Sequence, residues 1–279
     1  MKLIPSNFKE QILTMLKDGL KPSEISKLLN LNYVSTQQMC NRLGYTFTYN
    51  HGNNRYFQNI DTNVKAYMLG FITADGAIVN DTLTITIHTK DRCILETLKS
   101  EIGCENPIRE IHTKMSFDCS RQVDHVRFTI TDKLIISDLN NLGIYPRKSL
   151  TMENIIINIP KEFRKPFIIG YFDGDGSVTL PKGKVKFQKH TNSYILHPSH
   201  CLLVQFRGTK ELLLGITNEL EIPTHFYQRD SIGSLIISDK LSVIKFFNCY
   251  KDLTFFLRRK YNKFLMRIDH PSFQKLIQD

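Results

Sequence analysis

The chain has 279 residues, 41% of them hydrophobic and 23% charged, and its formal net charge is +10. This length is sufficient for two or three small domains with a sizeable core, and the excess of lysine and arginine favours a polyanionic partner, most simply nucleic acid. The first residues hold no apolar signal core and no stretch approaches the ~20 apolar residues of a membrane span, so we expect neither a secretory leader nor a membrane protein.

Six cysteines are scattered along the chain, and none forms a CxxC pair. We therefore expect reduced thiols and a cytoplasmic protein. The segment His197–Cys201 (HPSHC) places two histidines near a cysteine, which could hold a structural metal. Because it lacks a convincing fourth ligand, a polar hairpin loop is the simpler interpretation.

Residues 1–45 predict a small all-α domain. Apolar residues recur at helical spacing in Asn7–Gly19, and another helix is expected from Ser23, a good N-cap. Asn30–Asn32 predicts a tight turn before a further helix that ends near Leu43. Such a pair is typical of a helix-turn-helix domain that binds DNA, and a helical bundle without a role in DNA binding is the alternative. The outer face of the last helix would present polar residues to DNA: Ser35, Thr36, Gln37, Gln38, Asn41 and Arg42.

Residues 46–60 are polar, with aromatic residues and a Gly-Asn-Asn cluster, which predicts a linker. From residue 61 the chain repeats one plan twice. The first copy, 61–150, predicts a strand at Leu83–Thr89, a helix, a strand at Val126–Thr131 and a second helix.

The second copy, 166–279, has the same order of elements. Its strands are expected at Leu202–Thr209 and Ser234–Ser238, each followed by a helical stretch. A connector at 151–165 joins the copies. The sequence therefore predicts two related halves behind an N-terminal helical domain.

Each copy opens with an apolar run that ends in Asp-Gly: AYMLGFITADG in the first and PFIIGYFDGDG in the second. The pattern predicts two buried helices, because each run is apolar nearly all round. Small residues four apart on one face, Gly70 and Ala74 or Gly170 and Gly174, let two helix backbones approach closely. Glycine inside a helix costs about 1 kcal/mol relative to alanine, so we expect the two helices to pack through these faces.

This packing would place Asp75 and Asp175 side by side at the two helix ends. An acid at a helix C-terminus opposes the macrodipole, and two such acids repel each other unless a cation is present. Carboxylate pairs suit Mg²⁺, so the pattern indicates metal-assisted phosphodiester hydrolysis. The alternative, a simple turn after each core helix, is harder to maintain for two copies in a basic chain.

The stretches MLGFITADG and IIGYFDGDG resemble the signature motifs of the LAGLIDADG homing endonucleases. The resemblance covers about residues 61–270. It implies an α+β fold with two pseudo-symmetric αββαββα halves, whose strands form a saddle over duplex DNA. It also implies that the acid at the eighth motif position, here Asp75 and Asp175, binds metal, with two or three divalent ions (Mg²⁺) shared between them.

Two further features follow from the resemblance. The sixth motif position is often acidic in the family, and here it is Asp173 in the second copy but Thr73 in the first, which indicates asymmetry between the half-sites. The family also uses a lysine near the end of each half to polarise the water network at the scissile phosphates. The closing segments YPRKS and FLRRKY assign that role to Lys148 and Lys260.

The resemblance implies a monomeric endonuclease that makes a double-strand break with short 3′ overhangs in a long DNA target. Polar side chains lie where the second strands end, His88 with Lys90 in the first copy and Arg207 with Lys210 in the second. They would position water or contact DNA. Other expected DNA contacts lie on the hairpins: Thr84, Thr86, Lys184, Lys186, Gln188, Gln205, Gln228 and Arg229.

Two other functions remain open at this stage. One is a transcription regulator that kept the scaffold but lost cleavage. The presence of both Asp75 and Asp175 argues against it. The other is an RNA maturase that binds intron RNA on the same scaffold. An intein-embedded enzyme is not expected, because the chain starts with Met1 and has no flanking splicing residues.

Overall fold

The computed structural model describes residues 8–45, 52–114, 122–147, 152–181, 183–188, 190, 193–197, 201–223, 225–229, 232–268, 270–271 and 273. It divides into two compact units, Met1–Asn50 and His51–Asp279, which are described separately. Among the described residues, none of the helices has the length and apolar character that crossing a bilayer requires.

The first unit contains three helices, α1 (Phe8–Lys17), α2 (Pro22–Leu28) and α3 (Tyr33–Arg42). They pack around a small core of Ile12, Leu16, Ile25 and Cys40. This agrees with an all-α domain, but the expected N-cap of the second helix, Ser23, is wrong by two residues. The cap is Lys21, because Pro22 occupies the first helical position, where its fixed φ is favourable and its missing N–H is not needed.

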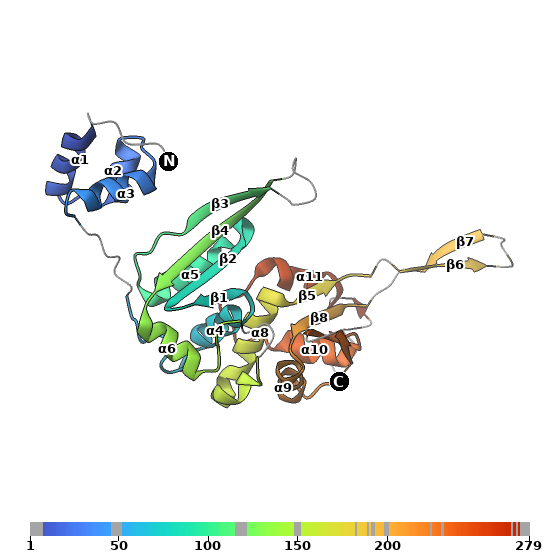
Figure 1. Ribbon diagram of the computed structural model, residues 1–279. Coiled ribbons are helices and arrows are strands. Elements are labelled where there is room, and N and C mark those ends of the chain that lie inside the picture. Colours follow the sequence, from blue (N-terminus) through green and yellow to red (C-terminus); the bar gives the residue numbers. More distant parts are fainter. Residues whose placement is uncertain are drawn as a thin grey trace. The chain divides into compact units, whose positions relative to one another are not determined.

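The second unit consists of two halves with the order αββαββα, confirming the predicted α+β plan (Figure 1). The elements of the first half are α4 (Asn63–Asp75), β1 (Gly76–Val79), β2 (Thr82–His88), η1 (Thr89–Asp91), α5 (Arg92–Ile102), β3 (Arg109–Lys114), β4 (Gln122–Thr131) and α6 (Lys133–Asn141). The connector contains η2 (Ile155–Asn158) and η3 (Lys161–Phe163). The elements of the second half are α8 (Arg164–Asp175), β5 (Ser177–Thr179), β6 (Lys184–Gln188), β7 (Ser193–His197), β8 (Leu203–Gly208), α9 (Lys210–Leu220), β9 (Phe226–Arg229), β10 (Ile232–Ile237) and α10 (Lys240–Asn248), followed by α11 (Arg258–Ile268).

The two four-stranded sheets have equivalent antiparallel orders, β1-β2-β4-β3 and β5-β8-β10-β9. The residue pattern predicted the two central strands of each sheet and missed the edge strands. Edge strands are short or bury few side chains, so they show little alternation. The hairpin β6–β7 forms a separate two-stranded sheet. It lies between β5 and β8 in the sequence and is an insertion relative to the first half.

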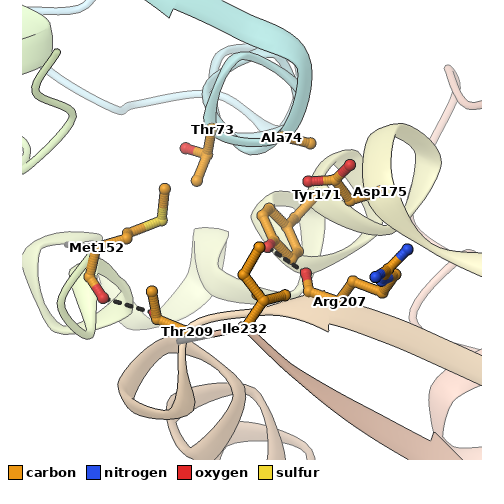
Figure 2. Close-up of a pocket in the computed structure, with 9 residues that line it drawn as sticks. Thr73, Ala74, Met152, Tyr171, Asp175, Arg207, Thr209 and Ile232 are labelled. Atoms are coloured by element: carbon orange, nitrogen blue, oxygen red, sulfur yellow. Dashed lines mark hydrogen bonds between the residues drawn. The ribbon is translucent and has the colours of Figure 1, made fainter. Parts of the chain in front are cut away.

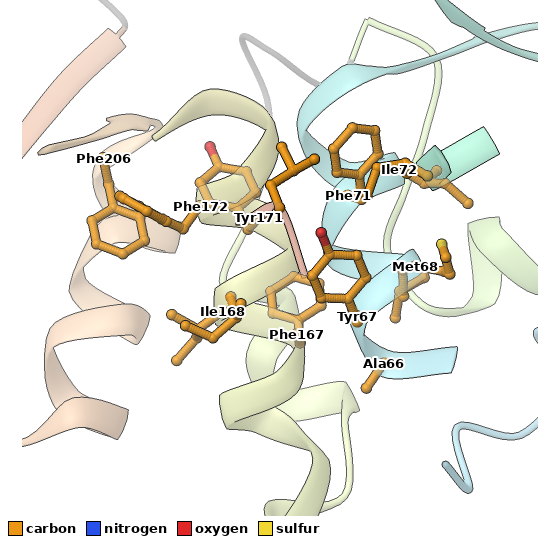
Figure 3. Packing of buried hydrophobic residues seen from close by; sticks show 14 of the residues in the cluster. Ala66, Tyr67, Met68, Phe71, Ile72, Phe167, Ile168, Tyr171, Phe172 and Phe206 are labelled. Carbon is orange, nitrogen blue, oxygen red and sulfur yellow. The ribbon is translucent and has the colours of Figure 1, made fainter. Parts of the chain in front are cut away.

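One hydrophobic core extends through both halves. The motif helices α4 and α8 lie at its centre, and their side chains interlock across the contact. Figure 3 shows Tyr67 and Phe71 of α4 facing the helix that carries Phe167 and Tyr171, and all four are buried. These helices are apolar nearly all round because each contacts its partner helix and its own sheet.

The expected linker at 46–60 is partly wrong. Tyr56, Phe57 and Ile60 are buried in the core of the second unit, with Phe57 fully enclosed. Arg55 forms an ion pair with the buried Asp138 of α6, at 2.9 Å between Nη1 and Oδ1. The aromatic residues explain the difference. Burying their large rings in the core stabilises the fold more than leaving them in a solvated linker would. Residues 46–51 lie outside the described residues.

Candidate active site

Glycine allows the two motif helices to approach at backbone distance. A Cβ added to Gly70 would collide with the carbonyl oxygen of Phe167, and one added to Gly170 would collide with that of Tyr67. Each glycine therefore faces the residue three positions before the other, which is the reciprocal contact expected of a pseudo-twofold axis. One turn later, Gly174 faces Ala74 and the carboxylate of Asp75.

This packing brings the two carboxylates together. Asp75 and Asp175 are the last residues of α4 and α8, and the following glycines leave in extended conformation. A Cβ built on Gly174 would lie 3.2 Å from Asp75 Oδ2, so Asp75 borders the turn that carries Asp175. Burial, together with the charges of Asp175 and Asp75, raises the pKa of the Tyr171 phenol. The charges of both carboxylates therefore reach the Tyr171 phenol.

The donor set here consists of carboxylate oxygens. Among the described residues, no group of three or more His, Cys, Asp or Glu side chains could hold a metal ion. Mg²⁺ does not need such a cage, since it is commonly held by one or two carboxylates with substrate phosphate oxygens and water. Asp75 and Asp175 therefore fit Mg²⁺ as a pair of protein ligands, with its other positions left to oxygen atoms from outside the protein.

A pocket of about 300 Å³ borders Asp175 on the side of the second sheet (Figure 2). Tyr171 donates from its hydroxyl to the carbonyl oxygen of Arg207 at 2.5 Å, and Thr209 donates to that of Met152 at 2.6 Å. Arg207 is exposed and brings a cation to the same pocket as Asp175. The prediction placed Arg207 at a strand end near the chemistry, and the structure places it on β8 in the lining of this pocket.

The sixth motif position differs between the halves. Thr73 is buried and donates to the carbonyl oxygen of Leu69, on its own helix, at 2.8 Å. Asp173 is also buried, but it accepts from the hydroxyl of Tyr67 and the amide of Leu257, both at 2.7 Å. Burial raises its pKa to about 6, although the bond from Leu257 opposes the shift. Asp173 thus joins α4, α8 and the segment before α11.

The two lysines expected to take part in catalysis have different outcomes. Lys148 lies outside the described residues. Lys260 is buried, with 4% of its surface exposed. Its Nζ donates to main-chain carbonyl oxygens at the end of α8, and burial lowers its pKa to about 8.

No protein-family model matches the chain, and no curated protein matches it. Among solved structures, the LAGLIDADG meganuclease I-AabMI bound to uncleaved DNA matches 76% of this chain and 90% of its own, with a TM-score of 0.48 and 13% identity. The homing endonuclease I-WcaI, bound to its DNA recognition sequence, matches 74% of this chain and 87% of its own, with a TM-score of 0.51 and 14% identity. This chain has the LAGLIDADG homing endonuclease fold.

In the first half of this LAGLIDADG fold, the uncovered sheet face carries three predicted residues. Thr84, Thr86 and His88 alternate on β2 with the buried Leu83, Ile85 and Ile87, and Thr86 and His88 are exposed. Lys90 is exposed too, but it lies in η1 after the strand.

The prediction missed exposed residues of the neighbouring strands on this face. Arg127 and His125 of β4 pair with Thr86 and His88 in the register, and Arg109 of β3 pairs with Arg127. Arg127 donates to the hydroxyl of Thr86 at 3.1 Å. The alternation in Val126–Thr131 predicts a strand, and its polar positions would have indicated Arg127 but not Arg109, which lies on the edge strand β3.

In the second half, Gln205 lies on β8 and donates to the hydroxyl of Ser234 at 3.1 Å. Gln188 is partly exposed on β6, in the inserted hairpin. Four other expected contacts fall on strands, but their side chains lie outside what the structure describes: Lys184, Lys186, Gln228 and Arg229.

The outer face predicted for α3 of the first unit needs correction. Ser35 and Thr36 are buried, with Thr36 donating to the carbonyl oxygen of Asn32 at 3.0 Å. They lie in the first turn against Asn32, the N-cap, which accepts from the amide of Ser35 at 3.1 Å. Gln37 and Gln38 are partly exposed and Arg42 is exposed, so these three remain available to a ligand.

Proposed function

We propose that the chain is a metal-dependent DNA endonuclease that makes a double-strand break in a long, specific target. The observation that carries the proposal is the pair Asp75 and Asp175 at adjoining helix ends, between two sheets of the LAGLIDADG fold. Like charges at the negative ends of two helices oppose both the macrodipole and each other, which a bound cation would relieve. I-WcaI, which shares the fold, is described as bound to its DNA recognition sequence.

The protein groups would divide the work as follows. Asp75 and Asp175 would hold two or three Mg²⁺ ions, which supply charge stabilisation at the scissile phosphates and a more acidic attacking water. Arg207, in the pocket beside Asp175, would contact the phosphate or orient water in the second half. The helix packing at Gly70 and Gly170 would fix the spacing between the carboxylates and so between the two cut positions.

The sheet faces would bind the duplex. Arg127, Arg109 and Thr86 lie together on the uncovered face of the first sheet, where arginine can bind guanine edges and hydroxyls can bond to bases or phosphates. The net charge of +10 would add phosphate contacts, so we expect affinity to fall steeply with salt. In the first unit, Gln37, Gln38 and Arg42 would extend the footprint.

The proposal is tested by incubating a randomised-duplex library with the full chain and Mg²⁺ and sequencing the ends produced. The variant Asp75→Asn/Asp175→Asn is compared with a control, Glu162→Gln/Glu211→Gln, which removes two exposed acids outside the site. We expect wild type and control to yield the same metal-dependent breaks with 3′ overhangs, and the site variant to yield none. Selective retention of some duplexes without breaks by all three proteins would contradict cleavage and favour a regulator.

A further inference from the structure

The end of α8 encloses a buried cation. Lys260 Nζ donates to the carbonyl oxygens of Phe172 (2.7 Å), Asp173 (2.7 Å), Gly174 (3.3 Å) and Gly176 (2.6 Å). An ammonium group has three N–H donors, so these four acceptors account for its hydrogen-bonding capacity. The turn that carries the site aspartate is therefore wrapped around the lysine.

The local structure explains why a cation is favourable here. The last carbonyl groups of a helix have no intrahelical partner, and together they form the negative end of its macrodipole. At α8 the chain leaves at Gly176 with φ −86° and ψ 163°, and only the bond from the Gly176 amide to Phe172, at 2.8 Å, continues the helical pattern. Asp173 and Asp175 add carboxylates to this end of the helix, and the charge of Asp173 favours the charged form of Lys260.

Lys260 is itself held in place from both halves. Immediately before it, Arg259 forms a two-bond ion pair with Asp91 of the first half, at 2.7 and 2.6 Å. The amide of Leu257 donates to Asp173, so the start of α11 is bonded to α8 independently of the lysine. A side chain that is buried, fully bonded and anchored in this way has little freedom to swing toward a substrate.

We propose that Lys260 is a positioning residue that holds the turn carrying Asp175, and that it does not act directly on the water at the scissile phosphate. The consequence for catalysis rests on the proposed endonuclease function. The claim that Lys260 holds the turn does not depend on that function. Removing the ammonium takes its bonds away from the carbonyl groups of Asp173, Gly174 and Gly176 and leaves Phe172 with the Gly176 amide, so the turn relaxes and Asp175 shifts. A misplacement of about 1 Å can reduce a catalytic rate about 100-fold.

The first measurement is amide hydrogen exchange of the full chain, without DNA or metal, in wild type, Lys260→Met and the control Lys263→Met. Lys263 is a lysine of the same helix that donates to the carbonyl oxygen of Val178 at 3.2 Å, outside the turn. We expect faster exchange confined to peptides that contain residues 173–177 in Lys260→Met, and none in the control. This result is independent of cleavage, so it stands even if the proposed function fails.

The second measurement is the single-turnover cleavage rate with saturating duplex and Mg²⁺, beside the dissociation constant of the duplex measured with Ca²⁺. We expect Lys260→Met to lower the rate on the order of 100-fold with unchanged duplex affinity, and Lys263→Met to leave the rate unchanged. A purely structural role would lower the folded fraction and leave the rate of the folded enzyme as it was.

Two outcomes would overturn the inference. Wild-type exchange at residues 173–177 in Lys260→Met, combined with lost cleavage, would show direct catalysis by the lysine. Unchanged exchange with unchanged cleavage would show that the cation has no role. If Lys260→Met fails to fold, Lys260→Gln, whose amide keeps two donors without the charge, takes its place in both measurements.

Discussion

The two halves of the second unit share one topology but support their aspartates in different ways. In the first half, Asp75 is partly buried against Gly174, and Thr73 donates to Leu69 of its own helix. In the second, Asp175 is exposed beside a pocket, and the end of its helix is held by Lys260 and Asp173. The repeated pattern thus sets where the carboxylates lie, while the departures from it set how firmly each is held.

The insertion in the second half extends this contrast. The hairpin β6–β7 lies between β5 and β8 in the sequence, although these two strands pair in the sheet, whereas β1 and β2 follow each other directly in the first half. Phe187 and Tyr194 form an exposed aromatic pair on this hairpin, with ring centroids 5.1 Å apart. Under the proposed function, the second half would therefore contact a longer part of its half-site than the first half does.

The largest effect on stability is expected from substitutions at the glycines that the two halves share. Gly70→Ala and Gly170→Ala each place a methyl group against a main-chain carbonyl of the other helix, which cannot move without separating the helices. We expect each to lower the free energy of unfolding by about 3 kcal/mol or more, to similar extents. Chemical denaturation checks this, and tolerance of either substitution would show that the helices are not in backbone contact.

A smaller effect is expected where the halves differ. Asp173→Thr gives the second half the residue of the first and removes an acceptor from two buried donors, Tyr67 and Leu257. We expect a loss of about 2 kcal/mol in the free energy of unfolding. Thr73→Val, which removes only a bond within its own helix, should change it by less than about 1 kcal/mol. Equal losses from both substitutions, measured by thermal unfolding, would mean that the sixth positions are equivalent after all.

The smallest effect on catalysis is expected from removal of residues 1–50. The second unit has its own core, so we expect it to stay folded and to cleave at saturating protein, with a shorter DNase I footprint and weaker binding. Loss of cleavage at saturating protein, with an unchanged circular dichroism spectrum for the second unit, would contradict this division of labour.

Much of the fold could be predicted because it depends on local patterns. The close helix contact is visible in the small residues Gly70 and Gly170, which recur in both copies. The first sheet is visible in Leu83–Thr89, where every second side chain is buried. The edge strands could not be found in this way, because they bury few side chains. The same holds for Tyr56 and Phe57, whose polar neighbours indicated a linker while their rings joined the core.

The candidate site could be predicted in part for a related reason. Asp75 and Asp175 were found because they break a local rule in both copies. The surroundings of Lys260 could not be found, because its partners are main-chain carbonyl groups about 85 residues away, which leave no trace in residue types. Ser35 and Thr36 were placed on an outer face because their polarity was considered without the cap at Asn32, which turns them inward.

The most direct test of the account is strand-resolved cleavage of a single duplex recovered from the library. Wild type, Asp75→Asn, Asp175→Asn and the control Glu162→Gln would each be assayed with Mg²⁺, with both strands end-labelled. If the two carboxylates form one metal-dependent site, each single aspartate variant loses double-strand cleavage by a factor on the order of 100 or more while duplex binding persists. Double-strand cleavage at the wild-type rate by both aspartate variants would contradict the account.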